Sequence, residues 1–243
     1  MKHISKTTMS AKVRIANSQV KNVAIIGGGA SGAIALDSLL QEDHVKTVTL
    51  YERRKDLGGI WNLDTKQDRD LSVPNDVVKP GYTEKQIDPQ LPNPFNEPEA
   101  SYKDGGKRKF ILRPRNTAKR FEETPSYSGM KTNIDRVVMT FSDNKHWFET
   151  VPEKDYTYVD RGDVQKYIER YITRNAANDK VSILQGTLVE DVERIEKKNP
   201  LEGELPYQFR LTLRQPVNEE FEVWFQETYD AVVVAIGHYF VPY

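Results

Sequence analysis

KNVAIIGGGASGAIALDSLLQEDHVKTVTLYE, residues 21–52, is the stretch of this sequence that determines its fold. The unbroken apolar run at 23–26 predicts a strand that is buried on both faces, as strands of parallel sheets are. Apolar residues recur at helical spacing over 33–40, and a second strand is predicted at 45–51. The stretch therefore predicts a strand–helix–strand unit, from which parallel α/β sheets are built.

A Gly-x-Gly-x-x-Gly pattern joins the first strand to the helix. Gly27 permits a tight turn, Gly29 lets the backbone approach a pyrophosphate, and Gly32 lets the helix pack closely on the strand. The N–H groups and the dipole at the helix N-terminus then hold the phosphates. The candidate pyrophosphate ligands are Gly27, Gly28, Gly29, Ala30, Ser31 and Gly32.

Glu52 follows the second strand, 20 residues after Gly32. A carboxylate at this position can accept both ribose hydroxyls of a dinucleotide. It favours FAD or NAD over a 2′-phosphorylated nucleotide, which it would repel, although the neighbouring Arg53 and Arg54 weaken that preference. The alternative, a glycine-rich turn in an ordinary α/β protein, leaves Glu52 without a role.

Composition excludes several classes of function. The net charge of −1 gives no electrostatic basis for a nucleic-acid partner. The absence of cysteine excludes disulfides, thiolate metal sites and a protein dithiol mechanism. The four histidines are too scattered to predict a metal site, and no apolar run of about 18 residues predicts a transmembrane segment.

The chain is predicted to have a flexible basic tail at 1–21 and one domain at 22–243, with a long irregular insertion at about 64–125. The tail is basic and rich in Ser and Thr, which is also typical of a transit peptide. The insertion is rich in proline and is predicted to be extended, partly mobile and on the surface.

Beyond the insertion, a helix capped by Asp163 is predicted from the spacing of its apolar residues. Further strands are predicted at 181–184, 207–213, 221–227 and 231–237, the second and third as an antiparallel hairpin and the last as fully buried. The apolar positions of the helix are Val164, Tyr167, Ile168 and Tyr171. Together these elements predict an α/β, doubly wound (Rossmann-like) domain with an antiparallel β flap.

Several motifs, taken in order, resemble the flavin-containing monooxygenases, particularly their fungal members. They are GGGASG at 27–32, Glu52, GGIWN at 58–62, YSGMKTNIDRVVMTFSD at 127–143, YVDRGDVQKYIERYI at 158–172 and VVVAIGHYFVP at 232–242. The first and last occur in many two-dinucleotide flavoproteins, whereas GGIW followed by the 127–143 motif is more particular. The resemblance covers residues 22–243 apart from the insertion.

The resemblance implies an enzyme of the N,N-dimethylaniline monooxygenase type that binds FAD. NADPH would reduce the flavin, and the C4a-hydroperoxyflavin formed with O₂ would oxygenate a small sulfur or nitrogen nucleophile. The flavin carries the difficult chemistry, so a site without an acid–base triad is expected.

The same resemblance assigns site residues. Asn133 would hydrogen-bond near the peroxide as the catalytic residue, and Thr132 would contact the nicotinamide side; an isolated Asn is otherwise typical of a turn. Trp61 would cover the flavin or pyrophosphate, with a core aromatic as the alternative. The other cofactor-binding residues implied are Gly59, Ile60, Val189 beside adenine, and Ala235 and Gly237 beneath the pyrophosphate.

The family pattern continues into a second glycine-rich site for NADPH, whereas this sequence ends at Tyr243. The expectation is a fragment of a longer protein or a truncated product whose own activity is open. The alternatives are another two-dinucleotide flavoprotein oxidoreductase and an inactive nucleotide-binding fragment. A cytoplasmic location is expected, with association at the endoplasmic reticulum surface as a second option and mitochondrial targeting less favoured. Oligomeric state is not predicted.

Overall fold

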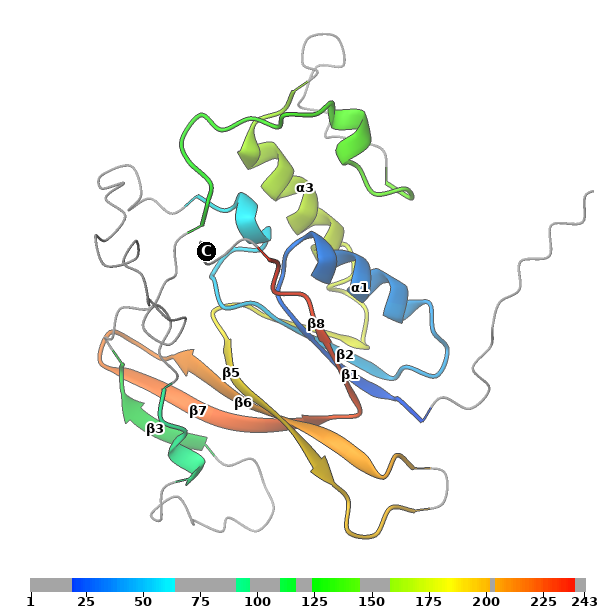
Figure 1. Cartoon of the computed structure of the whole chain (residues 1–243), viewed down its shortest axis with the longest axis vertical. Coiled ribbons are helices and arrows are strands. Elements are labelled where there is room, and N and C mark those ends of the chain that lie inside the picture. The colour runs from blue at the N-terminus through cyan, green and yellow to red at the C-terminus, as the bar shows by residue number, and fades with distance from the viewer. Residues whose placement is uncertain are drawn as a thin grey trace, which may run out of the picture.

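A parallel sheet forms the centre of the fold in the computed structural model of the chain (Figure 1). The structure describes residues 19–63, 91–96, 110–116, 124–144, 158–201 and 204–238. The sheet has the strand order β4-β2-β1-β8, and every neighbouring pair is parallel. Its strands are β1 (Asn22–Ile26), β2 (Thr47–Tyr51), β4 (Val181–Leu184) and β8 (Ala231–Val234).

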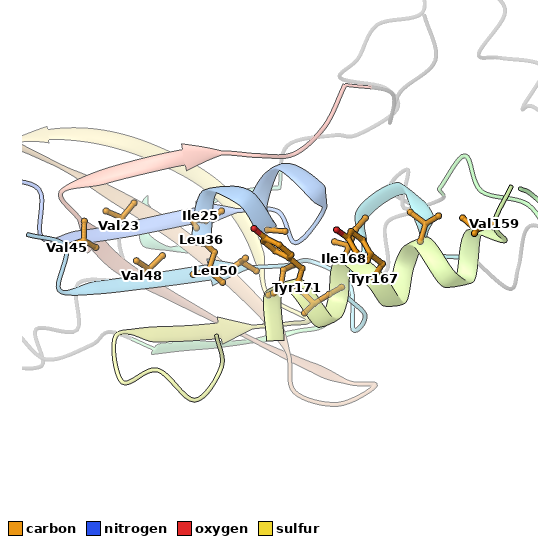
Figure 2. Close-up of a cluster of buried hydrophobic side chains, with 14 residues drawn as sticks. Val23, Ile25, Leu36, Val45, Val48, Leu50, Val159, Tyr167, Ile168 and Tyr171 are labelled. Carbon is orange, nitrogen blue, oxygen red and sulfur yellow. The ribbon is translucent and has the colours of Figure 1, made fainter. Parts of the chain in front are cut away.

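Two helices, α1 (Ala30–Leu40) and α3 (Arg161–Thr173), cover one face of this sheet (Figure 1). Alternate residues of β1, Val23 and Ile25, point to that face and pack with buried residues of both helices. Figure 2 shows this helix-side core. The labelled members are Val23, Ile25, Leu36, Val45, Val48, Leu50, Val159, Tyr167, Ile168 and Tyr171.

The opposite face of the sheet packs on an antiparallel flap with the strand order β3-β7-β6-β5. The flap strands are β3 (Phe110–Pro114), β5 (Leu188–Glu196), β6 (Tyr207–Pro216) and β7 (Phe221–Tyr229). Ala24 of β1 meets Leu211 and Leu213 of β6 in a flap-side core. Because β1 is covered on both sides, its apolar run has no polar position, as a two-sided strand requires.

The predicted fold class, a Rossmann-like α/β domain with an antiparallel flap, is confirmed. The two described helices lie on one face, and the flap takes the place of helices on the other. The predicted face of α3 is also confirmed, because its four apolar residues are all buried. The predicted cap is wrong: α3 begins at Arg161 after the extended residue Asp160, and Asp163 lies in the first turn, where a carboxylate suits the helix dipole.

The prediction of irregular structure for 64–125 is wrong at Phe110–Pro114, which forms β3 and pairs antiparallel with β7. The segment carries three consecutive large apolar residues, which suit a strand when a partner edge is available. A short 3-10 helix, Pro94–Asn96, also lies within this segment, and Leu91 is buried. The remaining positions of the insertion (64–90, 97–109 and 117–123), and residues 1–18 of the tail, lie outside the described residues.

The last predicted strand is less buried than expected. β8 pairs with β1, and in the described part of the chain it is the edge of the sheet. Val234 and Ile236 are 65% and 66% exposed. An apolar sequence predicts burial only where a neighbour covers it, and the described residues supply none on this side.

Candidate functional site

The glycine-rich loop fits its surroundings only because its residues lack side chains. Gly27 has φ of +109°, and a Cβ there would overlap the carbonyl oxygen of Ala235. A Cβ at Gly32 would overlap the carbonyl oxygen of Gly27. The chain thus makes a tight turn between β1, α1 and the end of β8, which confirms the sharp bend and close packing expected of this motif.

The N-terminus of α1 has the features of an anion site. Its N-cap residue is Gly29, no side chain caps the helix, and the first turn contains no acidic residue. Ala30 and Ser31 are exposed at this end. The first N–H groups of a helix have no partner within the helix, and its dipole is positive there. This end of α1 can therefore bind a phosphate group.

Glu52 lies beside the same loop and is only 4% exposed. One carboxylate oxygen accepts a hydrogen bond from the Gly28 N–H at 2.7 Å, and the other accepts from the Arg54 N–H at 2.8 Å. A carboxylate has about four lone-pair sites, so each oxygen keeps acceptor capacity for a hydroxyl group. Glu52 therefore joins the glycine loop to the end of β2 and can still accept ribose hydroxyls.

A second glycine turn, at 58–59, closes against the first. The Gly58 N–H donates to the Gly28 carbonyl at 2.9 Å. Gly59 has φ of +60°, and a Cβ there would lie 2.9 Å from the Gly29 Cα. The two loops thus meet backbone to backbone, so the GGIWN motif contributes directly to the architecture of the site.

Ile60 and Trp61 follow this turn in the 3-10 helix Gly59–Trp61. Ile60 is 39% exposed, whereas Trp61 is half-buried and packs against the helix-side core. This packing supports the core interpretation of Trp61. The predicted contact of Trp61 with flavin or pyrophosphate stays a prediction.

Two residues of α3 that were not predicted as site residues hold the second loop. Arg161 Nη1 donates to the Trp61 carbonyl at 3.1 Å, and Gln165 Nε2 donates to the Leu57 carbonyl at 3.3 Å. Arg161 and Gln165 are four residues apart, so they lie on one helix face. Their spacing in the sequence predicts a polar face of α3, next to the apolar face, that could contact a neighbouring loop.

Thr132 and Asn133 lie next to the N-terminus of α3. The Thr132 N–H donates to the Val159 carbonyl at 2.9 Å, and the Val159 N–H donates to Thr132 Oγ1 at 3.1 Å. Thr132 is buried, whereas Asn133 is exposed. The structure therefore gives Thr132 a fixed place in the fold and leaves Asn133 accessible to a ligand.

Val189 and Ala235 lie at the edges of the same region. The Thr187 N–H donates to the Glu52 carbonyl at 2.9 Å, which places the start of β5, with half-buried Val189, beside the end of β2. The Ala235 N–H donates to the Ile26 carbonyl at 2.8 Å. Gly237 has φ of +78° and is exposed.

The structure thus brings the first loop, the second loop, Glu52 and Ala235 together at the carboxyl ends of β1, β2 and β8. Open α/β sheets bind their ligands at this edge. Within the described ranges, no hydrogen bond connects Asn133 or Gly237 to the glycine loop. The same ranges contain no helix long and apolar enough to cross a membrane, and no group of three acidic or histidine side chains placed to hold a metal.

A parallel strand–helix–strand unit with these features defines a dinucleotide-binding protein of the Rossmann type. A family model described as FAD-NAD(P)-binding matches residues 24–239, and the chain belongs to this family. The match confirms the predicted cofactor class, FAD together with a nicotinamide dinucleotide.

Curated relatives are named as flavin-containing monooxygenases. The chain is 28% identical over 233 residues to flavin-containing monooxygenase iboF of Amanita muscaria, covering 92% of this chain and 40% of the relative. It is 25% identical over 226 residues to flavin-containing monooxygenase FMO GS-OX-like 6 of Arabidopsis thaliana, covering 91% and 36%. These matches confirm the resemblance carried by the motifs. The chain spans about two fifths of the length of these relatives.

A solved structure supports the fold. S-allyl-L-cysteine S-oxygenase from Allium sativum aligns with a TM-score of 0.53 at 21% identity, covering 92% of this chain and 38% of that one. At this identity the likeness is evidence for the fold alone.

Proposed function

We propose that residues 22–243 form the FAD-binding part of a flavin-dependent monooxygenase that uses NADPH and O₂ to oxygenate small sulfur or nitrogen nucleophiles. The observation that carries the proposal is the contact between the two glycine loops beside Glu52. It combines a fold for dinucleotide binding with GGIWN, which together with the 127–143 motif is the more particular part of the monooxygenase resemblance.

The ADP half of FAD would be held at the carboxyl edge of the sheet. The N–H groups of Gly29, Ala30 and Ser31 would meet the pyrophosphate at the uncapped N-terminus of α1. Glu52, already fixed by two backbone N–H groups, would accept the ribose hydroxyls. Its buried negative charge would disfavour a 2′-phosphate, which supports FAD rather than NADPH at this loop.

Toward the flavin end, Asn133 would hydrogen-bond to the isoalloxazine, and an amide suits this place because it donates and accepts without titrating. Thr132, tied to Val159, would set the position of Asn133. Bound flavin supplies the redox chemistry, while the chain binds it, orients it and limits access of water. The names of the curated relatives, flavin-containing monooxygenases, support an oxygenation reaction. The choice of a sulfur or nitrogen nucleophile follows from the motif resemblance.

The first experiment compares Gly29→Ala with Gly162→Ala in FAD titrations followed by flavin fluorescence. A Cβ at Gly29 has its nearest neighbour at 3.4 Å, and a Cβ at Gly162 has none within 4 Å, so both variants should fold. Both glycines lie at a helix N-terminus. We expect Gly29→Ala to weaken FAD binding at least tenfold, equivalent to about 1.4 kcal/mol, and Gly162→Ala to bind as the parent does. Equal affinities for FAD in both variants would contradict the assignment.

The second experiment supplies the FAD-loaded chain with NADPH, ¹⁸O₂ and a thioether or tertiary amine. A product carrying one labelled oxygen atom supports the monooxygenase proposal. NADPH oxidation without such a product would favour another flavoprotein oxidoreductase. FAD binding with neither activity would restrict the chain to nucleotide binding.

A further inference from the structure

The segment 130–144, which carries Thr132 and Asn133, is attached to α3 at both of its ends. At the first end, the Arg161 N–H donates to the Met130 carbonyl at 3.0 Å, beside the two Thr132–Val159 hydrogen bonds. These contacts lie at the N-terminus of α3. In Figure 1 this segment, coloured green, runs beside that helix.

The second end is attached by aromatic side chains farther along α3. The Phe141 N–H donates to the Tyr167 hydroxyl at 2.8 Å, and that hydroxyl donates to the Asn144 carbonyl at 2.5 Å. The Phe141 ring centroid lies 5.4 Å from that of Tyr167 and 4.2 Å from that of Tyr171. Both tyrosines belong to the helix-side core drawn in Figure 2, so the attachment is to a rigid surface.

An ionic contact completes the second attachment. Arg174 donates to Asp143 at 2.8 Å and to Asp37 of α1 at 2.6 Å, with its guanidinium carbon 3.7 Å from the centroid of the Tyr171 ring. The Tyr171 hydroxyl donates to the other oxygen of Asp143 at 2.9 Å. One arginine therefore joins α3 to α1 through Asp37 and to the 130–144 segment through Asp143.

The titration behaviour of these groups agrees with the geometry. The hydrogen bond from Arg174 lowers the pKa of Asp143, so this carboxylate stays charged and accepts both donors. Burial raises the pKa of the Tyr171 hydroxyl, which therefore keeps its proton and donates it.

Between its two attachments the segment has its own local structure. It forms the 3-10 helix Arg136–Met139, whose first turn is capped by the Asp135 carboxylate accepting from the Val137 N–H at 2.8 Å. The Thr140 hydroxyl donates to the Val137 carbonyl at 3.0 Å. A segment stiffened in this way can transmit a shift at one attachment to the other.

We propose that Asp143, held by Arg174 and Tyr171, is a positioning residue that fixes the Thr132–Asn133 turn relative to α3. The claim that this turn then meets the flavin rests on the function proposed above. The same helix holds the second glycine loop through Arg161 and Gln165. Asn133 and the 57–61 loop would therefore both be positioned relative to α3.

Asp37→Asn is a matched control for Asp143→Asn. Each carboxylate accepts through both oxygens, one of them from Arg174: Asp37 also accepts from Gln41 at 3.2 Å, and Asp143 also accepts from Tyr171. An amide keeps one acceptor and places a donor at the other oxygen position. Each substitution thus weakens one hydrogen bond that Arg174 donates, but only Asp143→Asn changes a residue of the segment 130–144.

The first measurement is hydrogen exchange by mass spectrometry on the flavin-free chain. We expect Asp143→Asn to accelerate exchange up to about fivefold in peptides covering 130–140, the range for a partly exposed ion pair, and Asp37→Asn to leave them unchanged. Acceleration confined to 141–144, or the same acceleration in both variants, would overturn the proposal. This measurement does not require that the chain bind FAD.

The second measurement is the visible absorption and circular dichroism of bound FAD. We expect Asp143→Asn to shift the flavin bands and Asp37→Asn to leave them as in the parent chain, because a purely structural role would not change the flavin environment selectively. Unchanged bands in Asp143→Asn, alongside accelerated exchange, would overturn the contact between this turn and the flavin. A parent chain that binds no FAD would contradict the proposed function, and exchange alone would then decide the positioning role.

Discussion

Replacing Glu52 with glutamine tests how the acid at the end of β2 contributes to folding, separately from any ligand. Glu52 is 4% exposed, and its carboxylate accepts one backbone N–H on each oxygen, at 2.7 Å from Gly28 and 2.8 Å from Arg54. A glutamine has the same shape, but one of its two terminal atoms is an NH₂ group. Whichever way the amide is turned, one N–H of the protein faces another donor.

The size of the effect follows from these contacts. Leaving one buried N–H without an acceptor costs about 1–3 kcal/mol, and the surviving hydrogen bond loses its charge assistance. We therefore expect Glu52→Gln to lower the free energy of unfolding by about 2–3 kcal/mol. For a domain of this size, this corresponds to a fall in Tm of about 4–12 °C.

The assay is urea or thermal unfolding of the ligand-free chain, followed by far-UV circular dichroism. Glu219→Gln is the control, since the Glu219 side chain is 97% exposed and pairs only at the surface with Arg115; its effect should stay within about 0.5 kcal/mol. A Glu52→Gln variant as stable as the control would refute the two-acceptor geometry. Loss of FAD affinity without loss of stability would mean that the carboxylate serves the ligand alone.

Three further predictions concern the glycine turn at Gly32, the exposed strand β8 and the contact between Asp143 and Arg174. Gly32→Ala should destabilise the chain by about 3 kcal/mol or prevent folding, because its Cβ overlaps the Gly27 carbonyl; circular dichroism of the purified variant checks this. Val234→Lys should reduce self-association in light scattering, because it puts a charge on the exposed edge strand β8, whereas Val217→Lys, at an exposed hairpin position, should not. The stability difference between the parent and Asp143→Asn should be present at neutral pH and lost as pH falls below about 4. The pKa of Asp143 is lowered in the folded state, so its contribution disappears on protonation; unfolding at pH 3 and pH 7 measures it, and an equal difference at both values would contradict the coupling to Arg174.

The parts of the fold that could be predicted are those encoded locally. The β1–α1–β2 unit follows from a short apolar run, a glycine turn and a helical repeat, all within residues 21–52. Glu52 could be predicted because its distance from the glycines is fixed by the length of one helix and one strand. The apolar face of α3 could also be predicted locally, since the helical period of its apolar residues does not depend on the packing partner.

The parts that could not be predicted depend on partners far away in the chain. β3 is a strand because the edge of β7, more than a hundred residues later, accepts it. The exposure of Val234 depends on whether another element covers β8, which its apolar sequence cannot specify. Arg174 is an unremarkable charged residue in the sequence, and its two carboxylate partners come from α1 and from the 127–143 motif.

Several of these contacts between distant parts of the chain are made by α3. Its apolar residues attach it to the sheet, while Arg161 and Gln165 hold the second glycine loop against the first. Toward its other end, Tyr171 and Arg174 hold the segment that carries Asn133. Both attachments are made to one helix packed on a buried core, so the second glycine loop and the segment 130–144 share a common support. A site whose parts come from separate loops gains its geometry in this way, since positioning groups act through rigid elements more accurately than through loops alone.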